Sequence, residues 1–362
     1  MNDYERKTIL IAPLDWGLGH ATRMIPVIRF LSAEYKVIVA APKKLQYIFD
    51  ETPAKIIAFP GYNIQYYNLP LWISLLIQGP KIGLRALQTV YKTRRLIKKI
   101  NPEVIIADNR PFVRSKKVKS VYITHQLSIQ HDNAVIKKFL NATHRFLINR
   151  FDACWIPDTT DSFFAGKLSQ GKLKISKYFI GGLSRFSTVE GKTNSEYKTV
   201  CVLSGPEPKR SQWKNEMKEM FSKEKQCLII GAVPGKNRFV KHGNITLSSH
   251  LSDDLFANVL SNAEKIITRS GYTTIMDLYR LKLNALLTPT PGQSEQAYLA
   301  DYHNGLYFHK FLSNTNKEAT FHDVTNDIKS KFCSKQQILA LIKNKKTNQC
   351  VPLRKNISIS TK

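Results

Sequence analysis

Two glycines and a histidine near the start of the chain have the residue types and spacing to handle a phosphate or a proton. The segment Gly17-Leu-Gly19-His20 follows an apolar run, and a helical pattern begins at its end. Glycines let the backbone turn tightly and approach a ligand, and the N-terminus of a helix favours negative charge. A histidine there could take a proton from a hydroxyl near neutral pH. The alternative interpretation is a tight strand-to-helix turn in which His20 caps the helix.

Three more polar side chains follow strand-like runs in the same half of the chain. Asp15 lies in the loop that carries His20. Asp108 and His125 each come directly after an apolar run. Parallel strands direct their carboxyl ends to one crevice, so these side chains should lie near one another. We therefore expect His20 to act as a general base with the help of Asp15 or Asp108. For His125 we favour a hydrogen-bonded structural role.

The second half carries groups that a nucleoside diphosphate sugar requires. After a strand-like run, Ser270-Gly271 turns the chain and Thr273-Thr274 begins the next helix. Hydroxyls and free backbone N–H groups at such a helix start can form a diphosphate site. Asp277, about one turn later, could accept hydrogen bonds from ribose hydroxyls. The polar loop after the following strand carries side chains that could bind sugar hydroxyls: Gln293, Glu295 and Gln296.

These loops need strands and helices to position them, and the chain alternates short apolar runs with helical patterns as parallel βαβ units do. In the first half the strand-like runs are 7–13, 36–41, 54–59, 103–107, 119–124, 152–156 and 177–180. The helical patterns between them are 20–34, 82–100 and 134–150. The second half repeats the alternation with strand-like runs at 199–203, 226–231, 244–247, 265–268 and 285–288. Its helical patterns are 211–224, 252–262, 272–282 and 294–304.

This alternation predicts an α/β fold with two Rossmann-like, doubly wound parallel sheets that face a cleft. We expect an N-terminal, acceptor-side domain over 1–182 and a polar linker over 183–198. A nucleotide-sugar-binding domain should follow over 199–345, with a basic tail over 346–362.

Composition and charge narrow the class of protein. The 362 residues hold 55 Lys and Arg against 27 Asp and Glu, a formal charge of +28 that attracts anionic partners. Nucleic acid, anionic membranes and phosphorylated small molecules all fit that charge. The 5 cysteines are dispersed without a C-x-x-C pair, which favours reduced thiols and argues against a structural zinc site. No secretory signal is recognisable, and the longest apolar run, 69–77, is shorter than the ~20 residues of a membrane span. We expect a cytoplasmic protein, either soluble or peripheral on the membrane.

The stretch 68–100 combines apolar and basic residues, with no acidic residue between Glu51 and Glu103. Leu84, Leu87, Val90, Ile97 and Ile100 recur at helical spacing, so we expect that stripe to face the core. Apolar anchors beside a cationic face suit an anionic bilayer. The candidate membrane contacts are Trp72, Leu75, Leu76, Lys81 and Arg85. The alternative is a buried helix with a solvated basic face.

The motifs of the second half resemble family 28 of the GT-B glycosyltransferases, the MurG-like UDP-N-acetylglucosaminyltransferases. The segment Arg269-Ser270-Gly271 followed by Asp277 resembles their donor signature, in which an acidic residue holds the ribose. Glu295 and Gln296 fall on the position of a Gln-Gln pair that contacts the donor sugar. The resemblance runs in order from residue 7 to about 310.

Further positions gain expected roles from this resemblance. Leu251 would meet the base through its backbone, and Arg185 follows a hinge segment whose arginine reaches the cleft. Ser204 and Gly205 stand in place of a second glycine-rich loop, here followed by a proline. Gly17, Gly19 and His20 match a glycine-rich loop that ends in a required histidine. The stretch 68–84 lies where the family has a membrane-facing patch.

The resemblance implies metal-independent, inverting transfer of a sugar, expected to be a hexosamine, from a UDP-sugar to a hydroxyl acceptor. The acceptor could be lipid-linked, as in cell-envelope polysaccharide synthesis. The diphosphate would leave against the helix start after Ser270 and against Arg185, and no D-x-D motif for a metal-bound diphosphate is present. We expect no cofactor and no nucleic acid partner. The alternatives are a nucleotide-sugar hydrolase or epimerase on the same fold, and a non-catalytic anion-binding protein.

Overall fold

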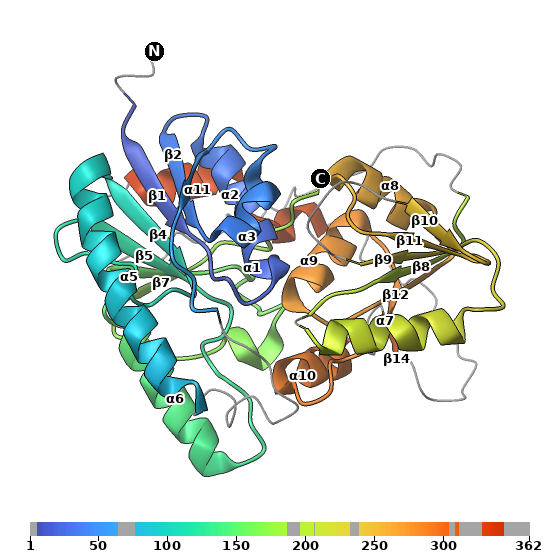
Figure 1. Cartoon of the computed structure of the whole chain (residues 1–362). Helices are drawn as coiled ribbons and strands as arrows, with labels where there is room; N and C mark the ends of the chain where they lie inside the picture. The colour runs from blue at the N-terminus through green and yellow to red at the C-terminus, as the bar shows by residue number, and fades with distance from the viewer. Residues whose placement is uncertain are drawn as a thin grey trace, which may run out of the picture.

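The computed structural model describes residues 6–63, 77–186, 196–205, 207–231, 239–303 and 328–343, together with the backbone of 308–310. Within these ranges the chain forms two seven-stranded sheets, each with helices packed on it. The two sheets lie side by side in separate halves of the molecule (Figure 1). The fold is therefore the predicted pair of Rossmann-like halves.

The sheet of the first half is parallel throughout, in the order β3-β2-β1-β4-β5-β6-β7. Its strands are β1 (Thr8–Ala12), β2 (Lys36–Ala41), β3 (Lys55–Ala58), β4 (Val104–Asp108), β5 (Lys119–Ile123), β6 (Ala153–Ile156) and β7 (Ser176–Phe179). Its helices are α1 (Leu18–Thr22), α2 (Met24–Leu31), α3 (Lys43–Gln46), α5 (Gly79–Ile100) and α6 (Ala134–Ile148). Central strands such as Ile9–Ile11 are fully buried because helices cover both faces of a parallel sheet. The strand order reverses between β1 and β4, which is where ligands bind in such sheets.

The sheet of the second half has the order β10-β11-β9-β8-β12-β13-β14, and only the pair β10–β11 is antiparallel among its described strands. Its strands are β8 (Thr199–Val202), β9 (Cys227–Ile230), β10 (Phe239–His242), β11 (Ile245–Ser248), β12 (Lys265–Thr268), β13 (Ala285–Leu287) and β14 (Phe308–Lys310). Its helices are α7 (Lys209–Met220), α8 (Asp253–Asn262), α9 (Tyr272–Leu281) and α10 (Ser294–His303). The strand order reverses here between β8 and β12. Each half therefore has one such point of reversal, called the switch point of its sheet.

The predicted strands of both halves are confirmed, but some elements were not predicted. The helical pattern 20–34 divides at Arg23 into α1 and α2. Strand β10 escaped prediction because all four of its residues are exposed, so no buried face marks it in the sequence. The short helix α3 and the edge strand β14 were also missed, since their 4 and 3 residues are too few to show a repeated hydrophobic pattern.

The chain crosses back to the first half near its C-terminus, which corrects the domain boundary predicted at 345. Helix α11 (Lys335–Lys343) packs on α2 and buries Ile338, Leu339 and Ile342. Lys343 Nζ lies 2.7 Å from Glu34 Oε2. In Figure 1 this last helix lies behind the N-terminal sheet. Residues 187–195 of the expected linker and the tail 346–362 lie outside the described residues.

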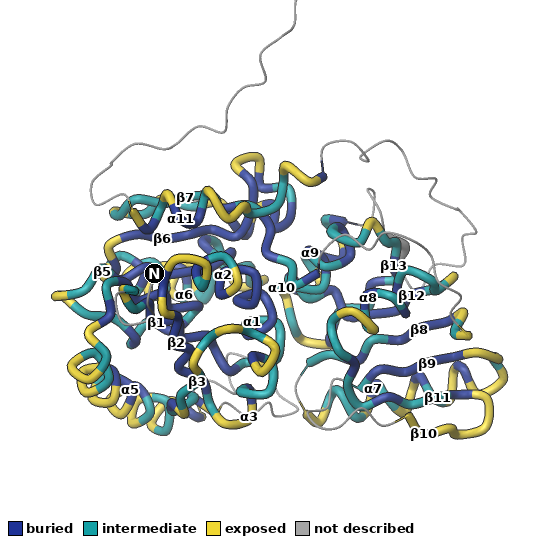
Figure 2. Tube along the Cα trace, turned by 90° about the horizontal axis from the view of Figure 1, so that it is seen from above, coloured by how far each residue is buried: buried dark blue, intermediate teal, exposed yellow. Residues whose placement is uncertain are grey.

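The predicted core-facing stripe of α5 is confirmed only at its C-terminal end, where Ile97 and Ile100 pack against the core. Leu84 and Leu87 are 68% and 69% exposed, and the buried positions are Ala86, Thr89 and Thr93. Small and β-hydroxyl side chains let this long helix lie close to its neighbours, so the larger leucines turn outward. Figure 2 shows the exposed outer turns of α5. The prediction of buried Leu84 and Leu87 was wrong.

Candidate active site

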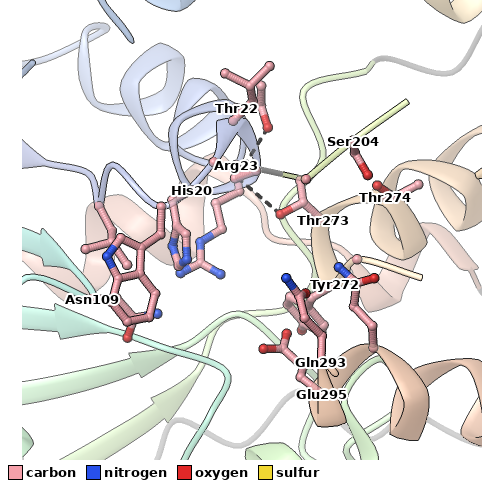
Figure 3. Close-up of a pocket in the computed structure, with 18 of the residues that line it drawn as sticks. His20, Thr22, Arg23, Asn109, Ser204, Tyr272, Thr273, Thr274, Gln293 and Glu295 are labelled. Atoms are coloured by element: carbon pink, nitrogen blue, oxygen red, sulfur yellow. Dashed lines mark hydrogen bonds between the residues drawn. The ribbon is translucent and has the colours of Figure 1, made fainter. Parts of the chain in front are cut away.

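A large cleft of about 2190 Å³ lies between the two halves. Its walls come from the loops after β1, β4 and β5 on one side, and from α8, α9 and the loop after β13 on the other. Figure 3 shows His20 and Arg23 on the N-terminal side, opposite Tyr272, Gln293 and Glu295. Ordinary small-molecule sites measure about 300–1,000 Å³. The cleft therefore has room for two substrates.

His20 and Asp108 meet at the switch point of the first sheet. The Nδ1 atom of His20 lies 3.0 Å from Oδ2 of Asp108, and the His20 side chain is 19% exposed. A carboxylate only accepts, so Nδ1–H donates to Asp108 and Nε2 keeps its lone pair. Gly17, with φ 103°, precedes α1 as its N-cap, and no side chain caps that helix. His20 is therefore not a helix cap, and its free ring nitrogen is available to a substrate hydroxyl.

Arg23 fixes the Asp108 carboxylate from the opposite side. Its Nε donates to Oδ2 at 3.1 Å and its Nη2 donates to Oδ1, and both side chains are buried. Burial raises the pKa of Asp108, but Arg23 and His20 outweigh burial and bring it below its usual value. Asp108 is thus ionised at neutral pH. Arg23 was not among the predicted site residues, although its spacing from His20 across one helical turn could have indicated it.

Asp15 supports a loop instead of the base. Its Oδ1 accepts from the backbone N–H of Tyr62 at 3.0 Å, and its Oδ2 accepts from that of Asn63 at 3.1 Å. Lys44 Nζ lies 3.3 Å from Oδ2. The carboxylate therefore anchors residues 61–63 at the cleft wall. Of the two carboxylates expected to help His20, Asp108 is the one that contacts it.

His125 joins the N-terminal half to Glu295 of the C-terminal half. Its Nδ1 lies 3.1 Å from Nη1 of Arg23, a group that only donates, so Nδ1 accepts and the proton sits on Nε2. Nε2–H then donates to Oε1 of Glu295 at 2.9 Å, and Gln126 donates to the other Glu295 oxygen. The ring stacks on Tyr272 at 3.8 Å. Burial lowers the pKa of His125 despite Glu295, so this histidine is neutral, buried and hydrogen-bonded.

The start of α9 faces the cleft with Gly271, Thr273 and Thr274. Thr273 Oγ1 donates to Gly19 O at 3.1 Å and thereby links the two halves. A Cβ at Gly19 would lie 3.0 Å from that hydroxyl, so a larger residue there would have to displace Thr273 by a few tenths of an ångström. Thr274 makes no such link, and its hydroxyl is close to the N-cap Gly271. The Thr274 hydroxyl and the first N–H groups of α9 therefore face the cleft, whereas Thr273 is engaged between the halves.

Arg269 and Ser270 lie behind the cleft wall, which corrects their prediction as donor-binding side chains. The Arg269 guanidinium lies 3.9 Å above the Trp213 ring and donates to Pro289 O at 2.9 Å. Ser270 Oγ donates to Gln296 O at 2.7 Å and is fully buried. Arg269 thus holds the loop after β13, and Ser270 holds the first turn of α10. The motif in the sequence cannot reveal on which side of the turn its side chains project.

Asp277 faces the cleft within a group of charges. Its Oδ1 accepts from Ser184 Oγ at 2.6 Å. Arg185 lies between two carboxylates, with Nη1 3.0 Å from Asp253 Oδ1 and Nε 4.0 Å from Asp277 Oδ2. Burial raises the pKa of Asp277 to about 6, although Arg185 and Ser184 oppose the shift. A nearby polar ligand would therefore meet a carboxylate that changes its charge near neutral pH.

The remaining predicted donor-side residues line the cleft: Ser204, Gly205, Leu251, Gln293 and Gln296. The Gln296 side chain is partly committed, because its Oε1 accepts from Thr290 N at 2.8 Å. Two other groups of the cleft wall were not predicted. Trp16 Nε1 and Thr290 Oγ1 are buried and have no hydrogen-bond partner among the described residues, so both are suited to contact a ligand. In the sequence, only their positions in the loops after β1 and β13 could have indicated that Trp16 and Thr290 belong to the site.

The N-terminal wall also carries an apolar surface that reaches the outside of the molecule. Its lining side chains include Tyr62, Ile82, Phe112, Ile129, Phe139 and Leu140. Phe139 is itself largely exposed. This part of the cleft suits the apolar body of a second substrate.

The candidate membrane contacts divide between described and undescribed residues. Trp72, Leu75 and Leu76 lie outside the described residues. Lys81 Nζ donates to Asn63 O at 3.2 Å, and Arg85 Nη1 donates to Gln88 at 2.9 Å. Nowhere in the described ranges does a helix have the length and apolar character to cross a bilayer.

Comparison with known proteins yields structural neighbours alone. No protein-family model and no curated protein matches the chain. The glycotransferase of kitacinnamycin is similar with a TM-score of 0.59 and 14% identity, covering 93% of this chain and 94% of that one. UGT2 of Phytolacca americana, solved with UDP-2-fluoro-glucose and pterostilbene, has a TM-score of 0.53 and 10% identity over 94% of this chain and 89% of its own. A proposed UDP-N-acetylglucosamine 2-epimerase of Listeria monocytogenes has a TM-score of 0.50 and 12% identity, covering 83% of this chain and 87% of that one. These likenesses show the GT-B fold.

Proposed function

We propose that this protein is a glycosyltransferase that moves a sugar from a UDP-sugar to a hydroxyl acceptor by a metal-independent, inverting mechanism. One observation carries the proposal: the His20–Asp108 pair faces the start of α9 across a cleft with room for two substrates. The first side offers a base for an acceptor, and the second offers partial positive charge for a diphosphate. The plant neighbour solved with a UDP-sugar analogue supports the choice of donor.

The proposed chemistry is a single displacement. Nε2 of His20 takes the proton of the acceptor hydroxyl, and the oxygen attacks the anomeric carbon. The bond from that carbon to the diphosphate breaks, its electron pair leaves with UDP, and the configuration inverts. Asp108 stabilises the imidazolium that forms. The N–H groups and Thr274 at the start of α9 stabilise the charge that develops on the diphosphate.

The proposed donor is a UDP-hexosamine. Asp277 would accept hydrogen bonds from the ribose, and the backbone of Leu251 would meet the uracil. The hexosamine rests on the sequence resemblance, and the position of Glu295 in the cleft is compatible with a hydroxyl-rich sugar. In this proposal Arg185 lies beside the ribose, where its contact with Asp253 would fix it, or it turns to the diphosphate.

A second candidate is an epimerase or hydrolase of nucleotide sugars, which the Listeria neighbour favours. Either enzyme would use the donor side of the cleft and dispense with an acceptor. The apolar N-terminal wall favours transfer, because neither epimerisation nor hydrolysis needs an apolar surface next to the base. A non-catalytic anion-binding protein would have no use for an oriented histidine–carboxylate pair.

UDP is expected to bind in the presence of EDTA, with an affinity that falls as the pH drops through about 6. Ribose hydroxyls donate to the ionised carboxylate of Asp277, so protonation removes an acceptor and weakens binding. Asp277→Asn should weaken UDP about tenfold or more near pH 7.5 and remove that part of the pH dependence. Calorimetric titration of UDP into both proteins over a range of pH measures this difference. The phosphate of UDP also has a second pKa near 6, so only the part of the pH dependence that Asp277→Asn removes is due to Asp277.

Glu264→Gln serves as the control, because this exposed carboxylate pairs with Lys198 away from the cleft. UDP-hexosamines should bind more tightly than other UDP-sugars. An absolute requirement for magnesium would contradict the metal-independent mechanism, and equal UDP affinity in the Asp277 variant would remove the ribose assignment.

We further propose that the acceptor is lipid-linked and that the protein binds anionic membranes through α5 and its flanking segment. Helices α5 and α6 both belong to the N-terminal half (Figure 1). Both carry exposed apolar side chains: Leu84, Leu87, Tyr91, Val135, Phe139 and Phe146. Basic residues surround those of α5, and each is worth roughly 1 kcal/mol beside an anionic surface. Trp72, Leu75 and Leu76 would add to the same contact.

Vesicles of anionic phospholipid should sediment the protein, less so as salt rises. Leu84→Ser with Leu87→Ser should reduce binding by about tenfold without unfolding, since both side chains are already exposed. The matched control is Phe239→Ser with Val240→Ser, an exposed apolar pair on β10 of the other half. Equal losses of vesicle binding in both variants would contradict membrane binding through α5. Full activity on a soluble acceptor without vesicles would contradict the lipid-linked acceptor.

A further inference from the structure

A continuous chain of buried contacts joins the His20–Asp108 pair to the other half of the molecule. Arg23 contacts Asp108 with two nitrogens and His125 with the third. His125 in turn donates to Glu295, the second residue of α10. His20, Arg23 and Glu295 all point toward one region of the cleft in Figure 3. The base His20 is thus connected through three side chains, those of Asp108, Arg23 and His125, to a carboxylate that the C-terminal half supplies.

Before the reaction, the charges of the side chains that make these contacts do not sum to zero. Asp108 and Glu295 are negative, Arg23 is positive, and His125 is neutral because its Nδ1 accepts from Arg23. The group carries one excess negative charge while His20 is neutral. When His20 takes a proton, the excess disappears. Because Asp108, Arg23 and His125 are buried, the balance of charge affects how readily His20 accepts the proton.

We propose that Arg23 and His125 are positioning residues through which Glu295 of the C-terminal half supports protonation of His20. This inference rests on the proposed transfer reaction. It gives Glu295 a role beyond contact with a sugar.

The surroundings of Glu295 agree with this role. Burial raises the pKa of Glu295, but His125, His20 and Arg23 together bring it below its usual value, so the carboxylate is ionised and senses the charge of His20. His125 is held flat against Tyr272, whose hydroxyl donates to Pro157 O. The ring therefore cannot turn away without breaking a stack and two hydrogen bonds.

Four titratable or charged groups face His20 from the described elements around it. They are Asp108 at the end of β4, Arg23 before α2, His125 after β5 and Glu295 on α10. Of these, Glu295 is the one that belongs to the C-terminal half and is partly exposed, with 33% of its side chain accessible. A neutral replacement at this position should therefore fold.

The test is the pH dependence of kcat for Glu295→Gln at saturating donor and acceptor. The amide can still accept from His125 and contact a sugar, but its charge is gone. We expect kcat near pH 7 to fall about tenfold and the acid limb of the profile to move down by about half a pH unit or more. Glu264→Gln, which removes one exposed carboxylate elsewhere, should leave both unchanged. If Glu295 only binds the sugar, KM for the donor rises and the acid limb stays in place, which would overturn the inference.

Arg23→Lys provides a second test, because it keeps the charge and loses the three-way contact. We expect kcat to fall about tenfold or more with little change in KM for the donor. Nitrogen-15 NMR of the wild-type histidines should show the Nε2–H tautomer for His125, and Arg23→Lys should disturb it. If the His125 tautomer and kcat are both unchanged in Arg23→Lys, the proposed positioning role of Arg23 and His125 is rejected. If the wild-type protein transfers no sugar from any donor, the proposed function is wrong. The NMR measurement still tests the contact between Arg23 and His125, because it does not depend on activity.

Discussion

Replacing His20 by alanine is expected to lower kcat for sugar transfer by about 10²–10⁴-fold, the usual loss when a positioned general base is removed. The reason lies in the orientation of the ring: Asp108 holds Nδ1 at 3.0 Å, which leaves Nε2 for the acceptor hydroxyl. UDP affinity should change little, because the donor groups lie across the cleft on α9. Steady-state kinetics with calorimetric titration of UDP separates the two effects.

The control for His20→Ala is His242→Ala, since His242 is an exposed histidine on the edge strand β10. That variant should retain wild-type activity. Near-wild-type turnover in His20→Ala would place the base elsewhere, with Asp108 as the next candidate. A folded His20→Ala protein that no longer binds UDP would instead assign His20 to the diphosphate.

The sequence was sufficient to predict the fold because its strands are buried on both faces. Runs such as Ile9–Ile11 and 104–107 are continuously apolar, and the polar residues that follow them mark the carboxyl ends of the strands. Parallel topology then brings those ends together, so His20 and Asp108 were expected in one crevice. The meeting of these two side chains follows from strand order alone.

Other parts of the site depend on information that the sequence pattern does not carry. Arg269 and Asp277 belong to the same motif, yet only Asp277 reaches the cleft, since the direction of a side chain in a turn depends on the backbone angles there. Asp15 lies in the right loop, but residues 61–63 from a distant segment occupy its oxygens. For Arg23 the spacing from His20 was a signal, but arginines are usually solvated, and its burial depends on Asp108, which is distant in the sequence.

Packing between distant segments explains the remaining differences. Helix α11 has the composition of an ordinary amphipathic helix, and nothing in its pattern tells which half it covers. Its apolar side chains find α2 because the chain returns across the molecule after the second sheet is complete. Likewise, the helical period of α5 predicts a stripe but not which of two adjacent stripes is buried. Long-range contacts decide both cases.

Asp108→Asn should lower kcat by about 10²–10⁴-fold and also destabilise the protein. The amide cannot stabilise an imidazolium as a carboxylate does. Its one oxygen can replace Oδ2, which accepts from His20 and from Arg23 Nε, but the amide NH₂ in place of Oδ1 would face Arg23 Nη2 as donor against donor. Arg23, which is fully buried, would lose its charge partner. Breaking such a buried pair from one side typically costs about 3–5 kcal/mol of unfolding free energy. Because the pKa of Asp108 is depressed in the folded state, its contribution is complete at neutral pH and disappears only in acid, as the pH falls through that pKa.

A double variant separates the catalytic effect of Asp108 from its effect on stability. Arg23→Met with Asp108→Leu removes both charges and fills the space with apolar side chains, so it should recover much of the free energy of unfolding that Asp108→Asn loses. Activity should remain as low as in the single variant, because no carboxylate orients His20. Chemical denaturation at pH 7 measures the first effect and steady-state turnover the second. Recovered turnover in the double variant would mean that Asp108 only neutralises Arg23, and the His20–Asp108 pair would then have no catalytic role.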